Sequence, residues 1–115
     1  MSETTRELAH IGKSVIIKGE LSGSEDLYLD GEVEGSIELK QNSVTVGPNG
    51  RVKGKITAKS VVIEGKVNSH VFGSERVEIR GAAVVNGDIV TKSIVIAEGA
   101  FFKGSVNQEG ESTAS

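Results

Sequence analysis

A short motif recurs six times along this chain, and no other feature of the sequence restricts its fold as strongly. The motif opens with two apolar residues separated by one other residue, an alternation typical of a strand with one buried face. The six opening pairs are Val15 and Ile17, Leu27 and Leu29, Val44 and Val46, Val61 and Ile63, Val77 and Ile79, and Ile94 and Ile96. These pairs begin at positions 15, 27, 44, 61, 77 and 94, so the steps between them are 12, 17, 17, 16 and 17. The repeat therefore has the length of one coil of a solenoid.

A second half of the motif follows each opening pair after a turn, and places a small residue between two apolar ones. Five copies are regular: Val33-Gly35-Ile37, Val52-Gly54-Ile56, Val67-Ser69-Val71, Val85-Gly87-Ile89 and Phe102-Gly104-Val106. We interpret Leu21-Gly23-Glu25 as the first, imperfect copy, because it follows the pair at Val15 and Ile17. Three turns are two residues longer than the others, at 47–50, 81–83 and 97–100, which a turn tolerates without a change of strand register.

The composition favours strands and turns. The chain has 15 Val and 10 Ile against 5 Leu, together with 15 Gly and one Pro. The apolar residues between 11 and 106 do not recur with the period of a helix. The sequence therefore predicts an all-β domain over 11–106, a single parallel β-helix of about six coils in which like residues stack in columns. The polar segments 1–10 and 107–115 are predicted to be a flexible N-terminal tail and a disordered C-terminal tail.

Charge and cysteine content exclude several classes of function. The net charge of −3 and the 3% aromatic content argue against nucleic acid as a partner. With no Cys, a thiolate zinc site and a cysteine nucleophile are excluded, and His70 occupies an outward strand position typical of a solvated side chain. We therefore expect no catalytic, metal or cofactor site. The chain also lacks a signal peptide and an apolar run long enough to span a membrane, so we expect a cytoplasmic protein.

The two ends of the predicted β-helix are the candidate functional surfaces. Each end of such a rod exposes unpaired N–H and C=O groups, and neither flanking segment is apolar enough to cover them. The last coil carries Phe101, Phe102 and Val106, and the first coil carries Val15 and Leu21. These five residues are the predicted polymerisation interface, through which each subunit continues the hydrogen-bond ladder of the next. The sequence does not decide whether like or unlike ends meet.

A second candidate surface runs along the side of the rod. The outward positions between the paired apolar residues are Ile16, Tyr28, Thr45, Val62, Glu78 and Val95. The apolar members, Ile16, Tyr28, Val62 and Val95, form a candidate lateral face for bundling or partner docking. Ordinary β-propensity at exposed strand positions explains the same residues, so both interpretations stay open.

The repeat resembles the bactofilin family of bacterial cytoskeletal proteins, chiefly through the segments 29–37 (LDGEVEGSI) and 61–67 (VVIEGKV), over about 11–106. The resemblance implies a right-handed β-helix that polymerises without nucleotide into non-polar filaments. It also implies partners among cell-wall enzymes and inner-membrane proteins, at the inner face of the cell membrane, and a role in cell shape. Family members keep an aromatic residue in the last coil for subunit contact, which maps onto Phe101 or Phe102. Some relatives begin with an apolar, basic membrane-targeting segment, which 1–7 does not resemble, so direct membrane binding is not expected.

Two other functions fit a β-helix. Left-handed β-helix acyltransferases build active sites between coils, usually around a His, but their hexapeptide repeat demands a regular step of three hexapeptides per coil. The shorter steps seen in this sequence and the single His within the repeat argue against such an enzyme. A binding scaffold that never polymerises is the other alternative. Sedimentation separates the alternatives, since a filament protein forms pelletable polymer and the other two stay monomeric.

Overall fold

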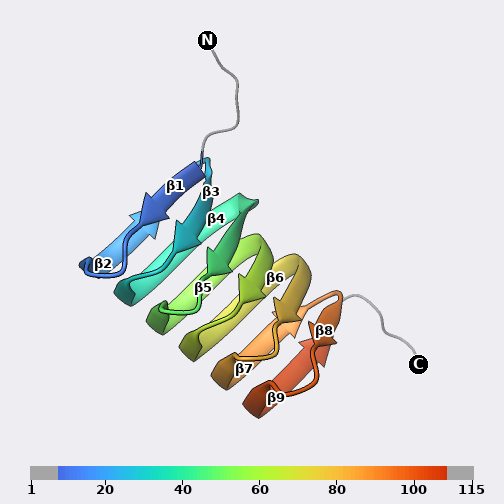
Figure 1. Cartoon of the computed structure of the whole chain (residues 1–115). Coiled ribbons are helices and arrows are strands. Elements are labelled where there is room, and N and C mark those ends of the chain that lie inside the picture. Colours follow the sequence, from blue (N-terminus) through green and yellow to red (C-terminus); the bar gives the residue numbers. More distant parts are fainter. Residues whose placement is uncertain (1–7, 109–115) are drawn as a thin grey trace.

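The computed structural model describes residues 8–108, which form six stacked coils built only of strands and turns (Figure 1). The strands are β1 (Leu8–Ile11), β2 (Ile16–Ser22), β3 (Asp26–Leu29), β4 (Glu32–Val46), β5 (Arg51–Ile63), β6 (Lys66–Ile79), β7 (Val84–Thr91), β8 (Ile94–Ile96) and β9 (Phe101–Gln108). The coils follow one another along a rod, so the first and last coils lie at opposite ends (Figure 1). The predicted parallel β-helix is therefore confirmed.

Each coil contributes one short and one long strand segment, and every pairing between coils is parallel. The strands β4, β5 and β6 each pass through a corner, so each supplies the long segment of one coil and the short segment of the next. In β4, for example, the long segment pairs with β5 as far as Leu39 and the short segment resumes pairing at Ser43. Two sets of ladders, one of short segments and one of long segments, thus run the length of the rod.

The core consists of apolar columns, each made of one residue per coil. One column stacks Leu29, Val46, Ile63 and Ile79, all with no exposed surface. The long segments add two more, Val33-Val52-Val67-Val85 and Ile37-Ile56-Val71-Ile89, which are at most 1% exposed. β-branched side chains suit these positions because they pack well between neighbours on a pleated surface.

The first coil differs from the sequence-based interpretation. β1 places Ala9 beside Leu27 and Ile11 beside Leu29, so the first opening pair is Ala9 and Ile11. The second half of the first coil is the segment 17–21, which pairs with 33–37. The assignments of 15–17 as an opening pair and of 21–25 as a second half were therefore wrong. Ala9 contributes only a weak apolar signal to the repeat. When the first pair begins at Ala9, the opening pairs begin at 9, 27, 44, 61, 77 and 94. The short first step then disappears and the spacing becomes even.

The corner between the short and long segments has either two or four residues. The three predicted longer corners, at 47–50, 81–83 and 97–100, are confirmed, the second of them as 80–83, and each is closed by a backbone hydrogen bond such as Gly50 N–H to Gly47 C=O at 2.9 Å. A fourth four-residue corner lies at 12–15, where the N–H of Val15 donates to the C=O of Gly12 at 3.1 Å. Because the sequence predicts a strand through this corner, it places the first coil out of register.

The strands extend a few residues past the predicted domain. β1 begins at Leu8 and β9 ends at Gln108, compared with the expected limits of 11 and 106. The remainder of the two predicted tails, 1–7 and 109–115, lies outside the described residues.

Candidate polymerisation interface

The edge strands of this solenoid lie in its first and last coils. Within residues 8–108, β1 pairs only with β3 and β2 only with β4, while β8 pairs only with β6 and β9 only with β7. Each end of the rod therefore presents two strands with one unpaired edge each. Such edges are templates for pairing with another chain.

The apolar columns that are closed in the middle of the rod are open at both ends. In the first coil, Ile17 and Leu21 are only partly buried, although they continue columns whose inner members are at most 1% exposed. In the last coil, the same holds for Phe102 and Val106, and Ile94 ends a column whose inner members are at most 4% exposed. A further coil stacked on either end would bury these side chains as the inner ones are buried.

Large exposed apolar side chains concentrate in the same two coils. The first coil has Val15 at 42% and Ile16 at 62%, and the last coil has Val95 at 41%, Ile96 at 46% and Phe101 at 55%. In the coils between, among residues 8–108, Phe72 at 37% is the single large apolar side chain of this kind. The apolar surface is therefore placed where one subunit would meet another.

The five predicted interface residues occupy both ends but play different parts. In the last coil, Phe102 stacks inward on Val85, and Val106 continues a core column. Phe101 points outward, because it neighbours Phe102 in a strand and side chains alternate. In the first coil, Leu21 lies in a core column and Val15 lies in the corner at 12–15.

Three further end residues, Ile17, Ile94 and Ile96, were missed as interface candidates although the repeat contains them. Each belongs to an inward column of an end coil. In the sequence, only their position in an end coil could have identified them, because any inward residue of the first or last coil lacks a neighbour on one side.

The N-terminal end is hollow. A cavity of about 460 Å³ opens there, with a wall formed by Ile11, Ile17, Leu21, Leu27 and Leu39. The polar residues His10 and Glu25 also line it. The apolar wall is the inner surface of the first two coils, and within the described residues no coil precedes the first to close the cavity.

Only some of the residues predicted for the lateral face lie in one column. The outward column of the short segments contains Tyr28, Thr45, Val62, Glu78 and Val95, as predicted, and begins with His10. Ile16 was wrongly included, because the shifted first coil places it beside Glu32 on the long segments. The rings of His10 and Tyr28 meet edge to face at 5.1 Å.

Glu78 further interrupts this column, since its carboxylate pairs with Arg76 at 3.3 Å and with Arg80 at 2.9 Å. In this column, Val62 and Val95 are therefore separated by a charged residue.

The polar clusters of the rod are surface features. His70 Nδ1 lies 3.5 Å from a carboxylate oxygen of Asp88, and both side chains are more than half exposed. The hydroxyl of Ser105 donates to the other oxygen of Asp88 at 2.7 Å, which completes a ladder across three coils. Within the described part of the chain, no three His, Cys, Asp or Glu side chains gather closely enough to bind a metal ion.

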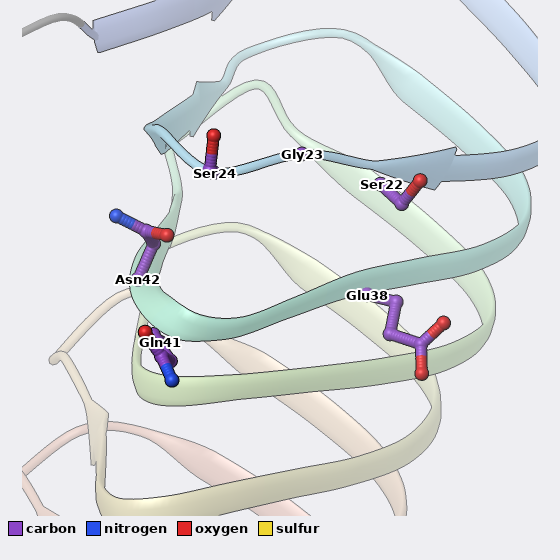
Figure 2. Close-up of a pocket in the computed structure, with 6 residues that line it drawn as sticks. All are labelled: Ser22, Gly23, Ser24, Glu38, Gln41 and Asn42. Carbon is purple, nitrogen blue, oxygen red and sulfur yellow. The ribbon is translucent and has the colours of Figure 1, made fainter.

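A polar hollow of about 380 Å³ lies at a corner of the first two coils (Figure 2). Its lining consists of Ser22, Gly23, Ser24, Glu38, Gln41 and Asn42. In Figure 2, Glu38 and Ser22 lie on the long segments, apart from Ser24, Gln41 and Asn42 at the corner. The side chains do not converge on one point, so the hollow lacks the arrangement of a nucleophile with its base.

No helix that could cross a membrane is present in residues 8–108.

Known proteins resemble this chain over most of its length. The family model described as "Bactofilin: Polymer-forming cytoskeletal" matches residues 9–107. Among curated relatives from Myxococcus xanthus, bactofilin BacO is 42% identical over 99 residues, which cover 86% of this chain and 78% of BacO. Bactofilin BacN is 41% identical over 105 residues, which cover 91% of this chain and 92% of BacN. Bactofilin BacP is 35% identical over 97 residues, and the match spans only 40% of its length.

A solved structure shares the fold. The chain aligns with a Thermus thermophilus bactofilin, determined by cryo-electron microscopy in double helical filaments, with a TM-score of 0.79 and 28% identity. The alignment covers 85% of this chain and 96% of the Thermus chain. Together with the coil architecture and the family match over almost the whole described region, these findings show that the chain belongs to the bactofilin family of polymer-forming cytoskeletal proteins.

Proposed function

We propose that this chain polymerises end to end, without nucleotide, into non-polar filaments that form a cytoplasmic scaffold for cell-envelope or cell-shape machinery. The proposal rests on a difference in exposure along each apolar column. Its side chains are buried in the inner coils and partly exposed in the first and last coils. Membership of a polymer-forming family supports it independently. The predicted interface residues Phe101, Phe102, Val106, Leu21 and Val15 all lie in these end coils.

The driving force of such a contact is apolar burial together with strand pairing. Closing an end would remove the partly exposed faces of the end columns from water, and would satisfy the unpaired edges of β8 and β9 or of β1 and β2. None of these groups needs to be charged or switched by a ligand. The contact therefore requires no bound nucleotide.

The symmetry of the end strands supports a non-polar filament. The inward positions of β9 are Phe102 and Val106, placed symmetrically about Gly104, so an antiparallel copy of β9 would set Phe102 against Val106 of the partner copy. Ile94 and Ile96 of β8 are placed symmetrically about Val95 in the same way. Like ends can thus pair as well as unlike ends, and pairing of like ends gives closed two-fold contacts.

Beyond itself, the filament would recruit cell-wall enzymes or inner-membrane proteins to its sides, with no role for nucleic acid. The net charge of −3 and the outward rows of mixed charge support protein partners over polyanions. We place the filament in the cytoplasm, held at the membrane by those partners and not by its own insertion.

Replacing one end residue tests both the interface and the polarity. Phe102→Arg puts a charge in the terminal column and should stop growth at the C-terminal end. In a non-polar filament the intact N-terminal ends still pair, so analytical ultracentrifugation should find dimers. Leu21→Arg should likewise give dimers, and the double variant should give monomers.

Phe72→Arg is the matched control, because it makes the same substitution at an exposed position far from both ends and should leave the polymers intact. Monomers from either single variant would mean that unlike ends meet. Long polymers of the double variant, with circular dichroism unchanged, would show that these coils are not the interface and would favour a different mode of assembly. A wild-type chain that stays monomeric would favour the non-polymerising scaffold.

A further inference from the structure

A hollow opens on the outward side of the long segments in the third, fourth and fifth coils, away from both terminal coils (Figure 1). Its volume is about 280 Å³. The polar side chains that line it come from three strands: Arg51 and Lys53 from β5, Lys66 and Asn68 from β6, and Asn86 from β7. All five are exposed. We call this hollow the basic recess.

The cations of the basic recess have no counter-ion of their own. Within residues 8–108, no ion pair of 4.0 Å or less involves Arg51, Lys53 or Lys66. The short segments differ, because there Arg80 lies 2.9 Å from a carboxylate oxygen of Glu78. The guanidinium and ammonium groups of the recess are therefore available to an anion from another molecule.

The two amides of the recess distinguish between kinds of anionic ligand. Asn68 and Asn86 are register neighbours, and neither side chain hydrogen-bonds to another of the described residues. An amide side chain both donates and accepts, as the backbone groups of a peptide do, whereas ionised carboxylate groups only accept. The recess therefore suits a peptide whose carboxylates contact the cations and whose backbone contacts the amides.

The spacing of the cations fits an extended peptide. Lys55 continues the row of Arg51 and Lys53 at alternate positions of β5, and it too is exposed. Alternate residues of an extended chain lie about 6.7 Å apart and point to the same side. A peptide that runs along β5 with acidic residues at alternate positions therefore repeats the spacing of these three cations. Lys66 lies beside Arg51 in the next coil and adds a fourth cation at one end of the row.

The second coil limits the width of the ligand. Glu32 and Glu34 lie beside the row of cations, one strand spacing of about 4.8 Å away. This separation is shorter than the Debye length of about 8 Å, so a nucleic acid duplex or an anionic membrane, which covers several coils at once, would be repelled. A single extended peptide is narrow enough to stay on the third and fourth coils. We propose that the basic recess binds an extended segment of a partner protein in which Asp or Glu alternates with other residues.

This surface specifies a chemistry for the partners that the proposed function places along the filament. It rests on that function only for the expectation that the partner is a protein. The recess belongs to a single subunit and uses neither end of the rod, so binding does not require polymerisation. In a filament the recess would recur in every subunit, and a partner with several acidic segments would gain avidity.

Fluorescence anisotropy with a synthetic peptide tests the recess. The probe is a labelled peptide with blocked termini in which three Glu alternate with Thr, and the protein is the full chain carrying Phe102→Arg and Leu21→Arg, so that polymers do not interfere. Arg51→Gln with Lys66→Gln should weaken binding by about tenfold or more, because two charge-assisted contacts are lost. Arg51→Lys with Lys66→Arg keeps both charges and should keep binding.

Lys59→Gln with Arg76→Gln is the matched control. It also removes one Lys and one Arg, but neither residue lines the recess, and both already lie near carboxylates. Binding of the peptide should therefore be unchanged. Equal weakening by the control would mean that only net charge matters, and would overturn the proposal. Unchanged binding in the variant that lacks Arg51 and Lys66 would overturn it as well.

Further ligands test the chemistry of the partner. A peptide of the same composition with its three Glu adjacent, an oligothymidylate with three phosphates and vesicles containing phosphatidylglycerol should all bind more weakly than the alternating peptide. Equal or tighter binding of any of these would overturn the assignment to an extended acidic peptide. Failure of the peptide to bind while the wild-type chain still forms polymers would refute the recess alone. Peptide binding by a wild-type chain that stays monomeric would refute the filament alone.

Discussion

Ser69 occupies a position that glycine holds in the neighbouring coils. Its register partner is Gly54, and the carbonyl of Ser69 lies where a Cβ on Gly87 would be. The serine is 7% exposed, and its hydroxyl has no hydrogen-bond partner among the described residues. An unsatisfied buried hydroxyl costs about 1–3 kcal/mol, so this side chain is a local weakness in the ladder.

Ser69→Gly should therefore stabilise the fold. The gain from removing the hydroxyl exceeds the roughly 0.5–1 kcal/mol that glycine loses through backbone entropy, leaving about 1 kcal/mol in favour of the variant. Urea unfolding of the end-blocked chain, Phe102→Arg with Leu21→Arg, measures this without interference from polymers. Ser74→Gly, at an exposed strand position, is the control and should bring no gain. A lower midpoint for Ser69→Gly would show that the hydroxyl contributes to the fold.

The residue scale also shows where sequence reasoning reached its limit at the interface. Phe101 and Phe102 were both candidates: the repeat placed Phe102 in an apolar column with Val106 but left open which of the two contacts a partner, and the pairing of β9 with β7 places Phe102 inward and Phe101 outward. Alternation predicts that the two side chains point to opposite faces of the strand, and the register of β9 against β7 decides which of them points inward. Ile16 was misplaced for a related reason, since its column depends on the register of the first coil.

At the scale of the coil, most of the fold follows from the sequence. The columns from the second coil onward were predicted correctly, because alternating apolar residues that recur once per coil can bury themselves only by stacking. The first coil could not be placed, because Ala9 contributes little apolar signal and a four-residue corner at 12–15 contains a valine that resembles strand sequence. Turn length is a local property, and the apolar period does not determine it.

Five of the six long segments have a glycine with positive φ at their middle, the fourth coil having Ser69 instead, and at Gly54 the glycine is an element-scale requirement. Gly54 has φ of 132°, and a Cβ there would collide with the carbonyl of Gly35 in the preceding coil. Gly54→Ala should therefore lower the melting temperature and destabilise the coil by more than the roughly 1 kcal/mol that alanine normally gains over glycine in regular structure. Gly12→Ala is the control, because a Cβ there meets no atom within 4 Å. Equal melting temperatures for the two variants would contradict this account of the coil contact.

At the scale of the whole molecule, the rod is a stack with two incomplete ends. Its inner coils are closed by neighbours on both sides, while the first and last coils keep open columns, edge strands and five exposed large apolar side chains. Stacked repeats gain stability from each new interface, so a subunit added at either end extends the same structure. Polymerisation would therefore continue, from one molecule to the next, the same stacking of coils that stabilises each molecule.

The most direct test is sedimentation of the wild-type chain in nucleotide-free buffer over a wide range of concentrations. We predict species larger than the monomer that grow with concentration to pelletable filaments, visible in negative stain. A single monomeric species at every concentration, with the β-rich circular dichroism of the folded chain, would contradict the claim that the open ends join.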